Sequence, residues 1–203
     1  ERKCFLCKYK TFSFIVSASH NINNLSTEFI IIDDKNIKLS NKAKFLIPEI
    51  DLAIYNITDN TLLNTLYLLD IEKNKFTIND IDETTDLFMI SNNNEIISTH
   101  ILFMQKEKYN NFCYPEMLKF FAKVTNNIEG CSGTPIFDRH NNIYGILSGY
   151  NKEYLNITPF FFVKRIISEI VMYTTFNGLC KFWHETVICD NKLIIAKNES
   201  IDC

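Results

Sequence analysis

The sequence predicts an all-β fold, a sandwich or barrels, with one helix near its end. Most apolar segments are short runs rich in Ile, Phe, Val and Tyr, and breakers rich in Asn and Asp separate them. Many short strands at this spacing are typical of sandwiches and barrels. Residues 160–173 differ, because apolar side chains recur there at helical spacing, after Pro159 at a helix-start position and Thr158 as a candidate N-cap.

The expected strands fall into two groups along the chain. Residues 58–84 have less regular patterning and many acidic side chains, so we expect them to connect two β units. After the helix, "HETVICDNKLIIAKN" predicts a hairpin that turns at Asp190 and Asn191. The chain thus divides into residues 1–83, 84–158 and 159–203. The expected strands are "FSFIVSAS", "TEFIIID" and "LAIYNI" in the first part, and "DLFMISN", "IISTHILFMQ", "TPIFD" and "IYGILSG" in the second.

The composition is that of an ordinary globular protein. The 203 residues are 46% hydrophobic, enough for a substantial core. The net charge is −3 with 22% charged residues, and no basic cluster suggests binding to nucleic acid or to a membrane surface. No apolar run approaches the roughly 20 residues that span a bilayer. We therefore expect neither nucleic acid nor membrane as a partner.

The seven cysteines predict a reducing, intracellular compartment such as the cytoplasm, because an odd number leaves at least one unpaired within the chain. Cys4 and Cys7 have the C-x-x-C spacing of redox and zinc sites, but a single pair is also what alternating strand residues produce. Residues 180–203 offer three more cysteines and His184 as candidate zinc ligands. Structural zinc sites usually present tighter ligand pairs, so we expect no metal and no cofactor.

Residues 126–138, "NNIEGCSGTPIFD", have the pattern of a nucleophile loop. A nucleophilic serine needs an exposed hydroxyl on a sharp turn, with backbone N–H groups aimed at the developing oxyanion. Gly130 and Ser132 would supply two such N–H groups, and Gly133 would leave room for substrate. Taken alone, the segment also fits a polar turn before a strand.

Two upstream segments offer the partners that such a serine requires. In "FIVSASH", small residues let the chain bend at a strand end and hold the His20 imidazole there. In "EIDLAIYNI", Asp51 stands directly before an apolar strand, where its carboxylate could accept a hydrogen bond from a histidine ring. Each residue in isolation also fits an ordinary loop histidine or a strand-initiating aspartate.

Taken together and in this order, His20, Asp51 and Ser132 resemble the motifs of the chymotrypsin-like serine proteases. "FIVSASH" is similar to that family's strand ending in Ala-Ala-His, and "IDLAIYNI" to its Asp-(Ile/Leu)-Ala-Leu segment. "GCSGTPIFD" is similar to its Gly-Asp-Ser-Gly-Gly-Pro box, and "YGILSGY" to the Gly-Ile-Val-Ser-Trp-Gly strand that walls the primary specificity pocket. The resemblance covers about residues 8–172 and extends to compact viral and high-temperature-requirement members, so association with a virion is expected as an alternative to the cytoplasm.

The resemblance implies two six-stranded antiparallel β-barrels with the site in the cleft between them, followed by a C-terminal α-helix and a short extension. It implies that His20 is the general base and then the acid. Asp51 would fix the tautomer of His20, and Ser132 would form the acyl-enzyme. The N–H groups of Gly130 and Ser132 would form the oxyanion hole.

The resemblance also implies a polypeptide substrate. Asn126 stands at the pocket-floor position in place of an aspartate, so a strong preference for Arg or Lys is not indicated. Ser148, Gly149 and Tyr150 would line the pocket, and Ser148 matches a serine that lies beside the triad aspartate in the family. The other functions left open are a weakly active protease fold used as a binding or structural module, and a single-use self-cleaving protease.

Cys131 departs from the family pattern. In the family's nucleophile motif, glycines stand two residues before and one residue after the attacking residue. Gly130 and Gly133 have these positions around Ser132, whereas Glu129 and Ser132 have them around Cys131. Cys131 also replaces the aspartate that pairs with a freshly cut N-terminus in trypsin-type members, so another contact must hold the loop in its active shape.

Only 19 residues precede His20. We expect a trimmed first barrel or a chain that starts upstream, as in a viral protease that processes a polyprotein.

Overall fold

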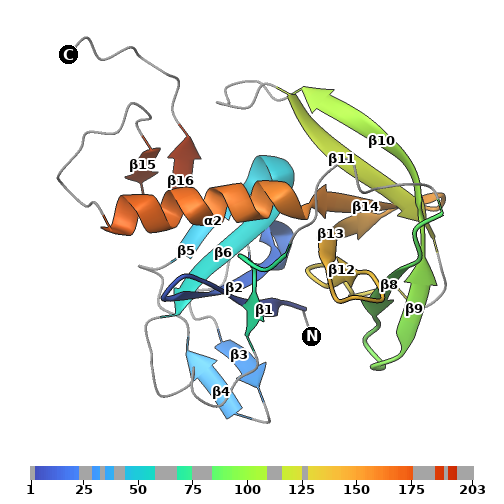
Figure 1. The fold of residues 1–203 in the computed structure, drawn as a ribbon, viewed down its shortest axis with the longest axis horizontal. Helices are drawn as coiled ribbons and strands as arrows, with labels where there is room; N and C mark the ends of the chain where they lie inside the picture. The colour runs from blue at the N-terminus through green and yellow to red at the C-terminus, as the bar shows by residue number, and fades with distance from the viewer. Residues whose placement is uncertain are drawn as a thin grey trace.

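The computed structural model describes residues 3–22, 29–32, 35–38, 44–57, 68–74, 84–108, 116–124, 128–175, 186–189 and 192–195. These residues form two main β-sheets, two small hairpins and one long α-helix (Figure 1). The all-β class with one helix is therefore confirmed for the described part of the chain. In that part, no helix is both long and apolar enough to cross a membrane.

The first sheet has five strands in the order β5-β6-β2-β1-β7. Its neighbours run antiparallel except for β1 and β7, which pair in parallel. Side chains alternate between its two faces, so Phe14 and Val16 of β2 enter one core and Ile15 enters another. The strands are β1 (Phe5–Tyr9), β2 (Phe12–Ala18), β5 (Lys44–Ile47), β6 (Leu52–Ile57) and β7 (Leu69–Asp70).

The second sheet has seven strands in the order β10-β11-β14-β13-β12-β8-β9, all antiparallel. Its core includes Leu87, Phe120 and Ile157, and Cys131 packs among them from the nucleophile loop. The strands are β8 (Leu87–Ile90), β9 (Ile96–Thr99), β10 (Ile101–Lys108), β11 (Glu116–Lys123), β12 (Pro135–Phe137), β13 (Ile143–Tyr150) and β14 (Tyr154–Pro159).

Helix α2 (Phe160–Thr175) follows β14 directly and packs on the first sheet, across which it lies in Figure 1. Its apolar face, including Val163, Ile167 and Ile170, shares one core with side chains of β1, β2, β5 and β6 and of β13 from the second sheet. The predicted helix is thus confirmed. Thr158 does not cap it, because Thr158 belongs to β14 and its hydroxyl donates to the Ile50 carbonyl at 2.9 Å.

All seven expected segments contain strands, although residues 96–105 divide between two strands, β9 and β10, and some other strands were not expected. The C-terminal hairpin is confirmed as β15 (Thr186–Cys189) and β16 (Lys192–Ile195), and a second hairpin joins β3 (Phe29–Ile32) to β4 (Lys35–Lys38). Strands β11 and β14 were missed because Lys, Asn and Thr interrupt their apolar pattern. The sheets have five and seven strands, so closure into two six-stranded barrels and the three-part division of the chain stay predictions.

Candidate active site

Sheet register brings His20 and Asp51 together. Strand β2 ends at Ala18, which pairs with Leu52 at the start of β6. The residues just after β2 therefore lie beside the residue just before β6. His20 sits in a 3-10 turn (Ser19–Asn21), and Asp51 follows another 3-10 turn (Pro48–Ile50). Asp51 itself adopts a left-handed conformation, with φ 54° and ψ 45°, which turns the chain into β6.

The Asp51 carboxylate accepts three hydrogen bonds from the histidine loop. Its Oδ2 lies 2.7 Å from His20 Nδ1, and its Oδ1 accepts from the His20 backbone N–H and the Ser19 hydroxyl, both at 2.9 Å. Because a carboxylate only accepts, Nδ1 carries the proton of a neutral ring and Nε2 is left as the acceptor. Sequence reasoning missed Ser19, whose role depends on a residue 32 positions away.

The nucleophile loop begins with a type II turn. The Cys131 N–H donates to the Ile128 carbonyl at 3.1 Å, which closes the turn, and Gly130 at its third position has a φ of +75°. A type II turn requires a positive φ there, so glycine is the residue that fits. Gly133 also has a positive φ, +93°, and a Cβ in its place would collide with the Lys3 carbonyl and the Ser17 hydroxyl. Gly130 and Gly133 thus both adopt a backbone conformation that favours glycine over other residues.

Cys131 and Ser132 face different environments. The Cys131 side chain is fully buried in the core of the second sheet, whereas Ser132 is only partly buried. The core therefore takes the thiol, and the Ser132 side chain is left partly exposed. Burial of this kind keeps Cys131 away from any substrate.

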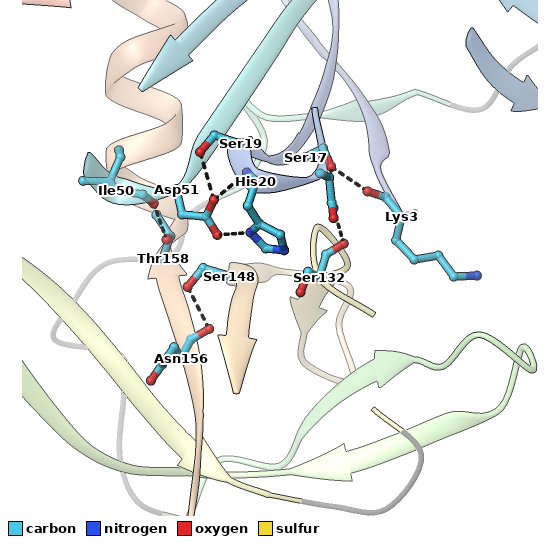
Figure 2. A network of polar contacts seen from close by, with 11 residues as sticks. Lys3, Ser17, Ser19, His20, Ile50, Asp51, Ser132, Ser148, Asn156 and Thr158 are labelled. Carbon is cyan, nitrogen blue, oxygen red and sulfur yellow. Dashed lines mark hydrogen bonds and ion pairs between the residues drawn. The ribbon is translucent and has the colours of Figure 1, made fainter. Parts of the chain in front are cut away.

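Asn21 joins the histidine loop to the nucleophile loop. Its Nδ2 donates to the Ser132 carbonyl at 2.7 Å and to the Ser17 hydroxyl at 3.2 Å. The His20 imidazole lies between Asp51 and Ser132, with the ring edge remote from Asp51 turned toward Ser132 (Figure 2). Among the described residues the Ser132 hydroxyl has no hydrogen-bond partner. Catalytic hydrogen bonds are often long without substrate and tighten when it binds.

Of the four residues expected to form the specificity pocket, the structure describes three. The Ser148 hydroxyl donates to the Asn156 carbonyl at 3.1 Å and not to Asp51, whose side-chain partners are Ser19 and His20 (Figure 2). The register of β13 against β14 shifts at this residue, which redirects it. Gly149 and the half-exposed Tyr150 end β13, and a Cβ on Gly149 would meet only open space. Asn126 lies outside the described residues.

The two N-terminal cysteines have free thiols. Burial raises the pKa of Cys4 to about 11, against a smaller opposing effect of Lys3, and burial also raises the pKa of Cys7. Cys7 lies in β1, as the alternating-strand interpretation expects, and Cys4 precedes that strand. The described residues contain no cluster that could hold a metal, while Cys180, His184 and Cys203 lie outside them.

Both thiols should therefore react slowly in the native protein. A thiolate is the reactive form, and at pH 8 a thiol with a raised pKa is almost entirely protonated. We expect alkylation by iodoacetamide at Cys4 and Cys7 to be at least about tenfold slower in native protein than in urea, measured site by site by peptide mass spectrometry. Equal rates in the two conditions would contradict the raised pKa values of the two thiols.

Replacing Asn21 with alanine should loosen the junction between the two loops. The change removes two hydrogen bonds and leaves the partly buried Ser132 carbonyl without this donor. We expect the free energy of unfolding to fall by about 1–3 kcal/mol in urea titrations. Asn93→Ala, at an exposed turn residue, is the matched control and should change it by less than about 0.5 kcal/mol. Equal values for the two variants would show that Asn21 does not join the loops.

The fold is that of known serine proteases. The structure is similar to the Rv3671c protease, crystallised in an inactive form, with a TM-score of 0.58 and 11% identity over 83% of each chain. It is also similar to the HtrA-type protease AlgW with a tripeptide, with a TM-score of 0.57 and 13% identity over 85% of this chain and 56% of that one.

A serine endoprotease from Yersinia pestis is a third similar structure, with a TM-score of 0.51 and 12% identity over 78% of this chain and 54% of that one. No protein-family model and no curated protein sequence matches the chain. The resemblance read from the sequence is thus confirmed at the level of the fold.

Proposed function

We propose that this protein is a serine endopeptidase with Ser132 as nucleophile, His20 as general base and then acid, and Asp51 as the group that orients His20. The observation that carries the proposal is the 2.7 Å contact of His20 Nδ1 with Asp51, on a ring whose other edge is turned toward Ser132 (Figure 2). The protease fold of the similar structures supports it.

In the proposed reaction, Ser132 Oγ attacks the carbonyl carbon of the scissile peptide bond while its proton passes to His20 Nε2. The Asp51 carboxylate stabilises the imidazolium that forms and holds the ring in place through Nδ1. Collapse of the tetrahedral intermediate expels the amine, which takes the proton from Nε2 and leaves an acyl-enzyme. A water molecule, deprotonated by the same nitrogen, then hydrolyses the ester and frees Ser132.

The oxyanion hole of this proposal consists of the N–H groups of Gly130 and Ser132. The type II turn supports it, because the intervening Cys131 N–H is used by the turn itself. In the described part of the chain, the N–H groups of Gly130 and Ser132 have no acceptor, so both can bind a developing oxyanion. Losing one such donor typically costs about 3–4 kcal/mol of transition-state stabilisation.

The proposed substrate is a polypeptide. The C-terminal end of β13, with Ser148, Gly149 and Tyr150, would wall the primary pocket, and Asn126 would form its floor. Open space beside Gly149 is compatible with a substrate chain lying there. A floor without a carboxylate favours uncharged side chains over Arg and Lys. We propose also that the two sheets belong to two six-stranded barrels.

A serine-reactive fluorophosphonate tests the proposal. An active enzyme should be labelled stoichiometrically at Ser132, as located by peptide mass spectrometry, and should cleave members of a peptide library. A protease fold used only as a binding module would instead bind peptides without cleaving them and would resist the reagent. That result would overturn the proposal.

A further inference from the structure

The turn between β8 and β9 presents Asn92 in a fixed position. Ser91 at its base is buried, and its hydroxyl accepts the N–H groups of Asn93 at 3.2 Å and Glu95 at 3.1 Å. The backbone adds two bonds, from Asn94 N–H to the Ser91 carbonyl at 3.1 Å and from Ser91 N–H to the Glu95 carbonyl at 2.9 Å. With four hydrogen bonds centred on one residue, this turn is stiff.

Asn92 contacts the nucleophile loop at the peptide between Glu129 and Gly130. Its Nδ2 donates to the Glu129 carbonyl at 2.6 Å. A carbonyl only accepts hydrogen bonds, so the amide nitrogen must be the group that faces it. The same nitrogen occupies the space in which a Cβ on Gly130 would lie. Asn92 therefore packs against this peptide as well as binding it.

That peptide is the central one of the type II turn, and its orientation determines where the Gly130 N–H points. Types I and II differ mainly by a flip of the central peptide, from φ near +80° to near −90° at the third residue. Gly130, at +75°, is in the type II state, and glycine tolerates both. In a planar trans peptide the N–H is opposite the C=O, so a bond that fixes the Glu129 carbonyl also fixes the Gly130 N–H.

We propose that Asn92 is a positioning residue that holds the Glu129–Gly130 peptide in its type II orientation and so keeps the oxyanion hole formed. This inference rests on the proposed function, which assigns the Gly130 N–H to that hole. The Asn92 contact also supplies support for the nucleophile loop, in which Cys131 stands where trypsin-type members have a charged aspartate. Asn92 and Glu129 lie 37 positions apart, and the bond crosses from the β8–β9 turn to the nucleophile loop.

Two substitutions of Asn92 should change the orientation of the Glu129–Gly130 peptide by different amounts. Asn92→Ala removes the donor and leaves both orientations available. Asn92→Asp does more, because a carboxylate repels the Glu129 carbonyl and attracts the Gly130 N–H, which favours the flipped peptide. Asn92 is exposed, so neither change disturbs the core. Asn93→Ala in the same turn is the matched control.

The rate constant of fluorophosphonate labelling at Ser132 measures the effect, because the phosphoryl oxygen of the reagent occupies the oxyanion hole during attack. We expect Asn92→Ala to lower it about 3- to 10-fold and Asn92→Asp at least about 10-fold, with Asn93→Ala within about twofold of the parent protein. Thermal unfolding temperatures should stay alike, which separates positioning from stability. Labelling of both Asn92 variants at the parent rate would overturn the proposal.

A second measurement does not depend on catalysis. Amide residual dipolar couplings of Gly130 report the orientation of its N–H in solution, and they should change in Asn92→Asp and stay unchanged in Asn93→Ala. If the parent protein is not labelled but this coupling changes, the proposed function fails and the holding role of Asn92 stands. If the parent is labelled and neither rate nor coupling responds to Asn92, the holding role fails and the proposed function stands.

Discussion

Replacing Ser132 with alanine is expected to abolish peptide cleavage and fluorophosphonate labelling. The change removes the attacking oxygen. The backbone at position 132 stays in place, including its N–H and the hydrogen bond that its carbonyl accepts from Asn21. Loss of the nucleophile of a serine protease lowers kcat on the order of 10⁶-fold. The measurement is kcat on a peptide found by library cleavage, together with the stoichiometry of labelling. Urea titration should give a free energy of unfolding close to that of the parent.

Cys131→Ala is the matched control for this experiment, because it alters the neighbouring residue and the rival nucleophile. Cys131 is fully buried in the second core, so its loss should cost stability, about 1–2 kcal/mol, and leave labelling at Ser132 intact. A labelled Cys131→Ala beside an unlabelled Ser132→Ala supports the assignment. The reverse pair, in which Ser132→Ala stays active and Cys131→Ala is dead, would make Cys131 the nucleophile.

Replacing Asp51 with asparagine is expected to lower kcat about 10⁴-fold. The carboxylate accepts all three of its hydrogen bonds, including the His20 Nδ1 contact. An amide that turns its NH₂ toward Nδ1 makes that nitrogen the acceptor, so the proton moves to Nε2. The ring can then no longer take a proton from Ser132. Substrate binding depends little on this contact, so KM should change by less than about threefold.

Ser19→Ala separates the tautomer effect from a general loosening of the loop. It removes one neutral donor to Asp51 and leaves the His20 contact, so kcat should fall no more than about 10-fold. Circular dichroism should show both variants folded. Equal losses in Ser19→Ala and Asp51→Asn would mean that Asp51 acts by holding the loop and not through the protonation of His20.

Local patterns in the sequence were sufficient to predict much of the fold and most of the candidate site. Helix α2 was predicted because apolar side chains at helical spacing depend only on neighbours along the chain. The role of Gly130 was foreseeable because a positive φ restricts residue type at a single position. Gly133 was expected to leave room for substrate, whereas the structure shows that a Cβ there would collide with the Lys3 carbonyl and the Ser17 hydroxyl. The motifs around His20 and Asp51 lie at strand ends, and the pairing of β2 with β6 brings them together.

Other contacts could not be read from the sequence because their partners lie far along the chain. Asn21 and Ser132 are 111 positions apart, and Asn92 and Glu129 are 37 apart, so no local pattern distinguishes these asparagines from the others. The Ser148 hydroxyl donates to the Asn156 carbonyl because a register shift between β13 and β14 redirects it. Such a shift depends on how the two strands pair. The sequence did not indicate which surface helix α2 covers, and the structure packs it against the first sheet and β13. Periodicity specifies which face of a helix is apolar, whereas the surface that buries this face is chosen only when the whole chain packs.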